Sequence, residues 1–152
     1  RQYRHPVGYR LVEIPAGLMD HVGENPLEAA QRELSEEVGL SADTWLTLTD
    51  TFSSPGAHEE NLRVFLATEL HPVSRPEDLD FEEADMQIYW ADRSALVDAI
   101  LAGQVQSPSL VYGVLALNVA VIAGRLPALR PANAPWPARQ EWVARHALQP
   151  GG

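Results

Sequence analysis

The sequence has 152 residues and 45% hydrophobic content, which is enough for one domain with a core and too little for two ordinary domains. Its 21 acidic residues outnumber its 11 basic residues, and the net charge of -10 argues against nucleic acid or an anionic membrane as the main partner. The absence of Cys excludes disulfides, thiolate metal sites and a cysteine nucleophile, and is compatible with a cytoplasmic location.

The N-terminal segment RQYRHPVGYR contains no Met and no hydrophobic signal sequence. We therefore expect a single domain over residues 1–152 whose N-terminal part is missing. The alternation of apolar and polar residues in YRLVEIPAG predicts a short strand that runs into a loop at Pro15. The following segment, NPLEAAQRELSEEVG, has the capping pattern of a helix that starts after Asn25 and stops before Gly39.

This predicted helix has two different faces. Its apolar residues recur at three- and four-residue spacing and anchor one face: Leu27, Ala30, Leu34 and Val38. The neighbouring face gathers Glu33, Glu36 and Glu37, although like charges at this spacing repel one another. Such a cluster is either a solvated surface or a group of cation ligands.

The rest of the chain alternates strand-like and helix-like segments. Two strand-like runs, TWLTLTDTF and LRVFLATEL, predict a hairpin around the loop SSPGAHEEN. An acidic loop, RPEDLDFEEAD, precedes a predicted third strand, MQIYWA. The remaining predictions are a helix over Arg93–Ala102, a helix opened by Ser107 and Pro108, an irregular Pro-rich tail, and a short helix over Glu141–Ala147. Mixed elements of this kind predict a layered α/β or α+β fold.

The run from Gly17 through Glu24 to RELSEEVGL resembles the signature of the Nudix hydrolases, G-x5-E-x7-R-E-U-x-E-E-x-G-U, where U is aliphatic. The spacing fits from Glu24 onward, and one extra residue stands between Gly17 and Glu24. An insertion in a loop costs little, whereas one inside the helix would rotate the carboxylates off their face. The resemblance implies a Nudix-type α/β/α sandwich with a mixed β-sheet.

The resemblance also implies a site for Mg²⁺ or Mn²⁺, which are hard cations that prefer carboxylate oxygens. The family's pattern makes Glu33 and Glu37 the principal metal ligands. Glu36 would assist in metal binding and catalysis, and Arg32 would orient the carboxylates. The run EIPAG is similar to that of the ADP-ribose pyrophosphatase subfamily, in which the carbonyl of the residue matching Ala16 completes a metal site. The five His residues show no metal-ligand spacing, so we interpret them as structural or surface groups.

Membership of this subfamily would imply further substrate and catalytic residues. The loop SSPG would bring Pro55 and Gly56 to the substrate, and YRH would bring Arg4 to its phosphates, unless Arg4 is only an edge-strand residue. Glu60 would approach the metals or the terminal ribose, or else face solvent. The segment FEEAD resembles the loop that carries the catalytic base, which indicates Glu83, with Glu82 as its nearest competitor.

The implied reaction is metal-dependent hydrolysis of ADP-ribose, a small nucleoside diphosphate sugar, to AMP and ribose 5-phosphate. A homodimer is implied as well. Two alternatives remain: a pyrophosphatase for another nucleoside diphosphate sugar such as GDP-mannose, or a catalytically inactive Nudix module that senses ADP-ribose.

Overall fold

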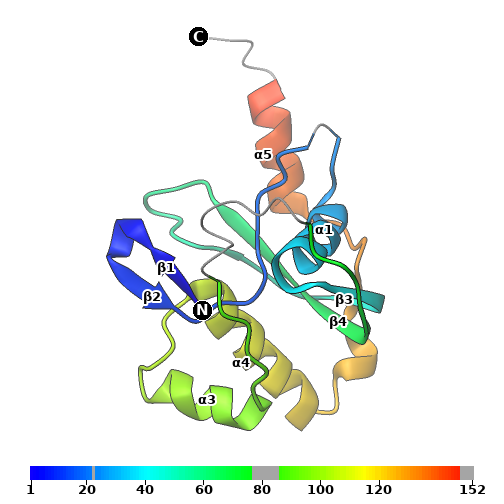
Figure 1. Cartoon of the computed structure of the whole chain (residues 1–152). Helices are drawn as coiled ribbons and strands as arrows, with labels where there is room; N and C mark the ends of the chain where they lie inside the picture. Colours follow the sequence, from blue (N-terminus) through cyan, green and yellow to red (C-terminus); the bar gives the residue numbers. More distant parts are fainter. Residues whose placement is uncertain (22, 77–85, 148–152) are drawn as a thin grey trace.

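A computed structural model describes residues 1–21, 23–76 and 86–147 of the chain (Figure 1). The first half contains β1 (Gln2–Arg4), the 3₁₀ turn η1 (His5–Val7), β2 (Tyr9–Leu11), α1 (Pro26–Val38), β3 (Leu40–Phe52) and β4 (Asn61–Pro72). The second half contains α3 (Arg93–Leu101), α4 (Pro108–Ile122), η2 (Leu126–Ala128), β5 (Arg130–Pro131) and α5 (Pro137–Ala147). Strands and helices are thus mixed along the chain, which confirms the α/β class.

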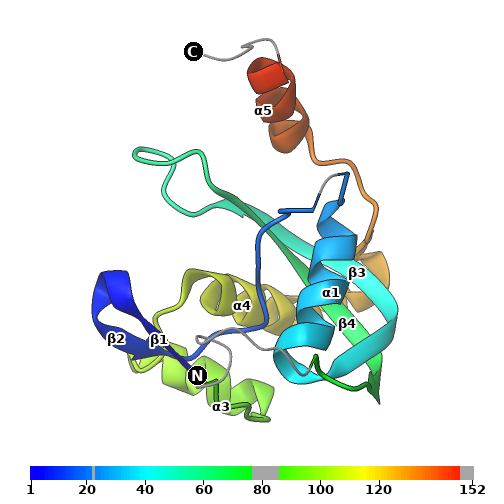
Figure 2. The same cartoon turned by 45° about the horizontal axis from the view of Figure 1, so that its top comes forward.

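The strands form two antiparallel sheets. β1 pairs with β2 in a small hairpin, and β3 lies between β4 and β5 in a three-stranded sheet. Every strand pair in the described residues is antiparallel, so the parallel pairing of a mixed sheet is not found in that part of the chain. Both α1 and α4 lie against the long β3–β4 hairpin, and α3 lies against α4 (Figures 1 and 2).

Helix α1 forms where the sequence predicts it, because its end signals are local. The side chain of Asn25 accepts hydrogen bonds from the backbone N–H groups of Leu27 and Glu28 at 2.9 and 3.1 Å. The carboxylate of Glu28 in turn accepts the N–H of Asn25 at 2.9 Å, which completes a capping box. Gly39 adopts φ 67°, a left-handed conformation that glycine permits, and ends the helix.

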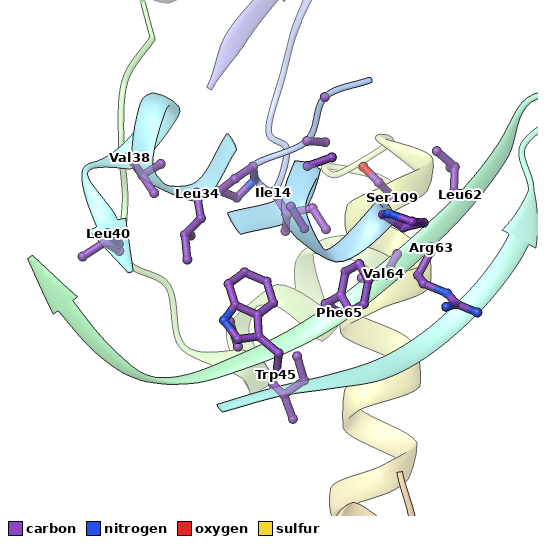
Figure 3. A pocket seen from close by; sticks show the side chains of 18 of the residues that line it. Ile14, Leu34, Val38, Leu40, Trp45, Leu62, Arg63, Val64, Phe65 and Ser109 are labelled. Carbon is purple, nitrogen blue, oxygen red and sulfur yellow. The ribbon is translucent and has the colours of Figure 1, made fainter. Parts of the chain in front are cut away.

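The core lies between α3, α4 and the segment that follows β2. Val105, Leu110 and Val114 are buried there, and Ile14 packs against them. Helix α4 approaches β4 closely at Gly113, where an added Cβ would stand 3.1 Å from Cγ1 of Val64. A largely apolar cavity of about 530 Å³ lies between α1 and the hairpin (Figure 3). Its lining includes Leu34, Val38, Trp45, Phe65 and Ile14.

The predicted strand over residues 86–91 is wrong, because this segment is not part of either sheet. Within the described residues it pairs with Arg1, whose N-terminal amine donates to the carbonyl of Gln87 and whose carbonyl accepts the N–H of Gln87. Tyr89 and Trp90 remain exposed. The alternating pattern is present, but a strand forms only where its backbone can pair with a neighbouring strand along its length.

The C-terminal region is more ordered than the sequence predicts. The Pro-rich tail contains η2 and β5, and α5 begins at Pro137 rather than at Glu141. A proline at the first helical position loses no hydrogen bond, so it can start the helix. None of the helices in the described ranges has the length and apolar character needed to cross a membrane.

Candidate functional site

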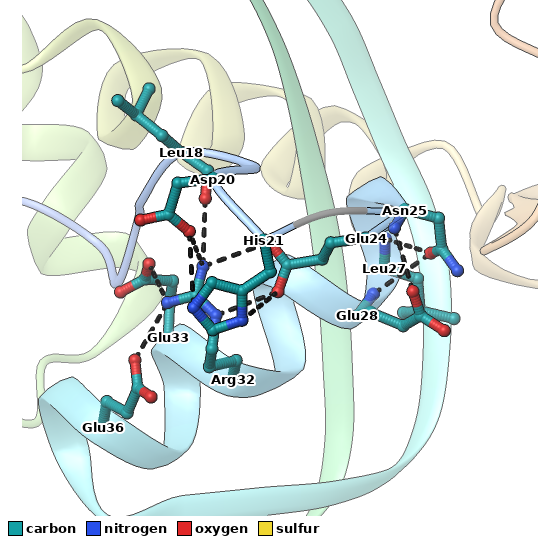
Figure 4. Close-up of polar contacts among 10 residues, drawn as sticks. All are labelled: Leu18, Asp20, His21, Glu24, Asn25, Leu27, Glu28, Arg32, Glu33 and Glu36. Atoms are coloured by element: carbon teal, nitrogen blue, oxygen red, sulfur yellow. Dashed lines mark hydrogen bonds and ion pairs between the residues drawn. The ribbon is translucent and has the colours of Figure 1, made fainter.

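Arg32 is the centre of a carboxylate cluster on α1 (Figure 4). Its Nη1 donates to Oε1 of Glu33 at 2.7 Å and to Oε2 of Glu36 at 2.9 Å. The four-residue spacing places Glu36 on the same helix face as Arg32, whereas Glu33 is the next residue along the chain. Hydrogen bonds between charged groups are stronger than neutral ones, so Nη1 helps to hold both carboxylates in place.

The same guanidinium also binds the loop that precedes α1. Nε donates to Oε1 of Glu24 at 2.9 Å, and Nη2 donates to the carbonyl of Leu18 at 3.0 Å and to Asp20 at 3.2 Å. Arg32 therefore ties the loop and the helix into one unit (Figure 4). Its hydrogen bond to Glu24 raises the pKa of Arg32, and the contacts with Glu36 and Glu33 add to this effect. The same bond from Arg32 lowers the pKa of Glu24.

Glu33 lies partly buried against the backbone of Gly17. A Cβ added at Gly17 would stand 1.9 Å from Oε1 of Glu33, so only glycine leaves room for this carboxylate. Burial raises the pKa of Glu33, and this rise exceeds the lowering caused by its hydrogen bond with Arg32. A carboxylate that has lost hydration in this way gains from a bound cation.

Glu37 is buried, with 8% of its surface exposed. It lies beside Ala16, which precedes the loop that leads into α1. The backbone N–H of Ala16 donates to Oε2 of Glu37 at 3.0 Å. The main chain of Ala16 and the carboxylate of Glu37 are thus neighbours, although 21 positions separate them in the sequence. The carbonyl of Ala16 as a metal ligand stays a prediction.

Three residues of the loop form a second group with ligand chemistry that the sequence analysis missed. Asp20, His21 and Glu24 each offer one ligand atom, and these atoms lie within 4.8 Å of one another. The imidazole of His21 lies 3.8 Å from Asp20 and 3.9 Å from Glu24. The only sequence signal was one His between two acidic residues in a loop, which is too common a pattern to mark a site.

Arg4 shares a cleft with Glu37. A cavity of about 110 Å³ is lined by Arg4, Glu13 and Glu37, among other residues. Nε of Arg4 donates to Oε2 of Glu13 at 3.0 Å, and the side chain of Arg4 is about one-third exposed. The structure therefore places Arg4 next to one of the predicted metal ligands. Glu13, its partner, is the first residue of the EIPAG run, but the sequence analysis assigns no role to its side chain.

The predicted substrate residues Pro55, Gly56 and Glu60 all belong to the loop between β3 and β4, residues 53–60, which we call the β3–β4 loop. Oε2 of Glu60 accepts the hydroxyl of Ser53 at 2.5 Å, so this carboxylate helps to close the loop. In the described residues, none of the hydrogen bonds joins this loop to the Arg32 cluster. Glu83 and its competitor Glu82 lie outside the residues that the structure describes.

Most of this chain is similar to known proteins. The family model described as NUDIX domain matches residues 1–109. The chain is 44% identical over 135 residues to an ADP-ribose pyrophosphatase of Mycobacterium tuberculosis, a match that covers 89% of this chain and 64% of that protein. It is 38% identical over 101 residues to an ADP-ribose pyrophosphatase of Bacillus subtilis, which covers 65% of this chain and 54% of the relative. A methanol dehydrogenase activator of Bacillus methanolicus is 37% identical over 82 residues, 54% of this chain and 44% of that protein.

Proposed function

This chain belongs to the NUDIX family, and from that premise we propose that it hydrolyses the diphosphate bond of ADP-ribose to AMP and ribose 5-phosphate. The observation that carries the proposal is the cluster in which Arg32 holds Glu33 and Glu36 on one side of α1. Two similar proteins bear the name ADP-ribose pyrophosphatase, which supports this substrate. The chain spans less than two thirds of the length of either relative.

The charge of the Arg32 cluster is compatible with a bound divalent cation. Arg32 contacts the carboxylates of Asp20, Glu24, Glu33 and Glu36, so negative charge exceeds positive charge at the cluster. We propose that Glu33, Glu36, Glu37 and the carbonyl of Ala16 hold Mg²⁺ or Mn²⁺. When bound, such an ion neutralises charge on the diphosphate oxygens and makes a water molecule more acidic.

The chain's own residues then have separate tasks. Arg32 keeps the carboxylates of Glu33 and Glu36 in place, which avoids rearrangement during the reaction. Arg4 contacts the phosphates from the cleft that it shares with Glu37. Pro55, Gly56 and Glu60 contact the sugar end of the substrate. Glu83 accepts the proton of the attacking water.

The role of Glu83 is tested by comparing two neighbouring variants. We expect Glu83→Gln to lower kcat by about 10² to 10⁴, because a general base acts in the transition state, and to leave KM close to that of the wild type. Glu82→Gln is the matched control, since it changes the same group one position earlier and should keep its activity. Loss of activity in Glu82→Gln alone would move the assignment to that residue, and full activity in both variants would place the base elsewhere.

The reaction itself is tested with a panel of nucleoside diphosphate sugars. AMP and ribose 5-phosphate release phosphate when a phosphatase is added, whereas intact ADP-ribose does not. We expect release with ADP-ribose and Mg²⁺, and none when EDTA is present or in Glu37→Gln. Faster turnover of GDP-mannose would favour the first alternative function. Binding of ADP-ribose without any hydrolysis would favour the inactive sensing module.

We further propose a homodimer in the cytoplasm. The lack of Cys is compatible with this location, and the resemblance to the ADP-ribose pyrophosphatase subfamily is the basis for the dimer. Sedimentation of the protein measures the oligomeric state directly, and a monomer at working enzyme concentrations would contradict the dimer.

A further inference from the structure

Helix α5 lies outside the part of the chain that matches the family, residues 1–109, yet it contacts a loop inside that part. Nε1 of Trp142 donates a hydrogen bond to Oε2 of Glu59 at 2.7 Å. Glu59 stands next to Glu60 in the β3–β4 loop, and 83 positions separate it from Trp142. The contact therefore joins the C-terminal helix to the loop that carries the proposed substrate residues.

The loop is closed by its own hydrogen bonds. The N–H of Ser53 donates to the carbonyl of Glu60 at 3.2 Å, and the hydroxyl of Ser53 donates to the carboxylate of the same residue at 2.5 Å. The N–H groups of Ala57 and His58 both donate to the carbonyl of Ser54 at 2.9 Å. These bonds lie within the loop and close it on itself. The contact of Glu59 with Trp142 is an additional bond to another element, and it stabilises the closed loop.

The base from which α5 extends is firmly held. The preceding segment, residues 130–136, which we call the C-terminal strap, is attached to the hairpin through Arg63. The guanidinium of Arg63 donates to the carbonyl of Ala134 at 2.8 Å and lies 4.7 Å from the ring centre of the buried Trp136. It also forms a bidentate pair with Asp50, at 2.7 and 3.0 Å. Because α5 starts directly after the C-terminal strap, these bonds also fix the position of Trp142 relative to the hairpin.

We infer that Trp142 is a positioning residue for substrate binding, because it holds the β3–β4 loop through Glu59. A loop that is ordered before binding loses less conformational freedom when the substrate arrives, so affinity rises without any new contact. The inference rests on the proposed function of Pro55, Gly56 and Glu60 in holding the sugar end of a nucleoside diphosphate sugar. It assigns to α5 a role in the affinity for that end of the substrate, and none in the chemical step.

The decisive variant is Trp142→Phe, which removes the Nε1–H donor and keeps an aromatic ring. We expect KM for ADP-ribose to rise about 3- to 10-fold with kcat nearly unchanged, as the loss of one hydrogen bond to a charged group implies. Glu59→Ala should have the same effect, and Glu59→Gln, which keeps an acceptor oxygen, should largely restore the wild-type KM. The double variant Trp142→Phe/Glu59→Ala should be no worse than either single one.

Trp45→Phe is the matched control. The Nε1–H of Trp45 also donates a hydrogen bond, at 3.0 Å, but to the carbonyl of Ala42 within β3. Its loss should leave KM unchanged. If Trp142→Phe has a wild-type KM, or if the effects of Trp142→Phe and Glu59→Ala simply add, Trp142 does not position the loop.

A second measurement separates this inference from the proposed function. Hydrogen exchange of the amides of Ala57 and His58 in the protein without substrate should be faster in Trp142→Phe than in the wild type. If the wild type hydrolyses no diphosphate sugar, the proposed function fails, and the exchange result still decides whether α5 orders the loop. Unchanged exchange in Trp142→Phe would overturn the inference whatever the activity.

Discussion

At the scale of single residues, Gly17 determines where the carboxylate of Glu33 can lie. We expect Gly17→Ala to displace this carboxylate, because the new methyl group would stand 1.9 Å from Oε1 and 2.2 Å from Cδ of Glu33. The affinity for Mg²⁺, measured by calorimetric titration, should fall at least about tenfold, since a shifted ligand no longer fits a small, geometrically demanding ion. Gly56→Ala adds the same methyl group where nothing lies within 4 Å, and should keep the affinity. Equal affinities in the two variants would contradict the role of Gly17.

Sequence reasoning at this scale succeeded where residues are close along the chain. The contact between Arg32 and Glu36, four positions apart, follows from the helical repeat alone. It failed where the partner lies far away in the sequence. The contact between Trp142 and Glu59 spans 83 positions, and nothing in either local pattern indicates the other residue.

At the scale of elements, the start of α1 depends on one side chain. We expect Asn25→Ala to lower the free energy of unfolding by about 1 kcal/mol, because the N–H groups of Leu27 and Glu28 lose their acceptor. Urea unfolding followed by circular dichroism measures this difference. Asn25→Ser keeps a capping oxygen and should lose only part of that stability. An Asn25→Ala protein as stable as the wild type would mean that the capping box contributes nothing measurable.

The elements that the sequence predicts correctly are those whose signals lie close together along the chain. The ends of α1 are marked by residues inside or beside the helix, so the predicted and observed bounds agree. The hairpin of β3 and β4 was also predicted, although both strands are longer than their patterns indicate. Residues 86–91 have the pattern of a strand, but in the part of the chain that the structure describes their backbone pairs with Arg1 and not with a neighbouring strand. Strand formation depends on available partners, and a single segment carries no information about them.

At the scale of the whole molecule, Asp50 links the sheet to the C-terminal strap and makes stability depend on pH. Burial raises the pKa of Asp50, but the hydrogen bonds from Arg63 and Arg130 outweigh it and leave the pKa below its ordinary value of 3.8. A carboxyl group with a lowered pKa in the folded state stabilises the fold fully above its unfolded pKa. This contribution is lost as the pH falls from about 4 through the folded pKa.

We therefore expect Asp50→Asn to lower the free energy of unfolding by about 2 kcal/mol at neutral pH, and by less near pH ~3, where the unfolded state binds a proton at this carboxyl more readily than the folded state does. Urea unfolding at both pH values measures the two differences. Asp43→Asn removes a carboxylate from an exposed pair with His71 and should change stability little. A difference for Asp50→Asn that does not shrink in acid would show that its effect is not electrostatic.

The attachment of the C-terminal strap also orders the events of folding. The β3–β4 hairpin joins neighbouring strands, so it can pair as soon as Pro72 has been synthesised. The bonds from Arg63 to Ala134 and from Arg130 to Asp50 close loops of 71 and 80 positions, and such long-range contacts form late. Because chains fold from the N-terminal side during synthesis, α1 and the hairpin can form on the ribosome before the C-terminal strap emerges. The contact of Trp142 with the β3–β4 loop can therefore form only after α5 has emerged from the ribosome.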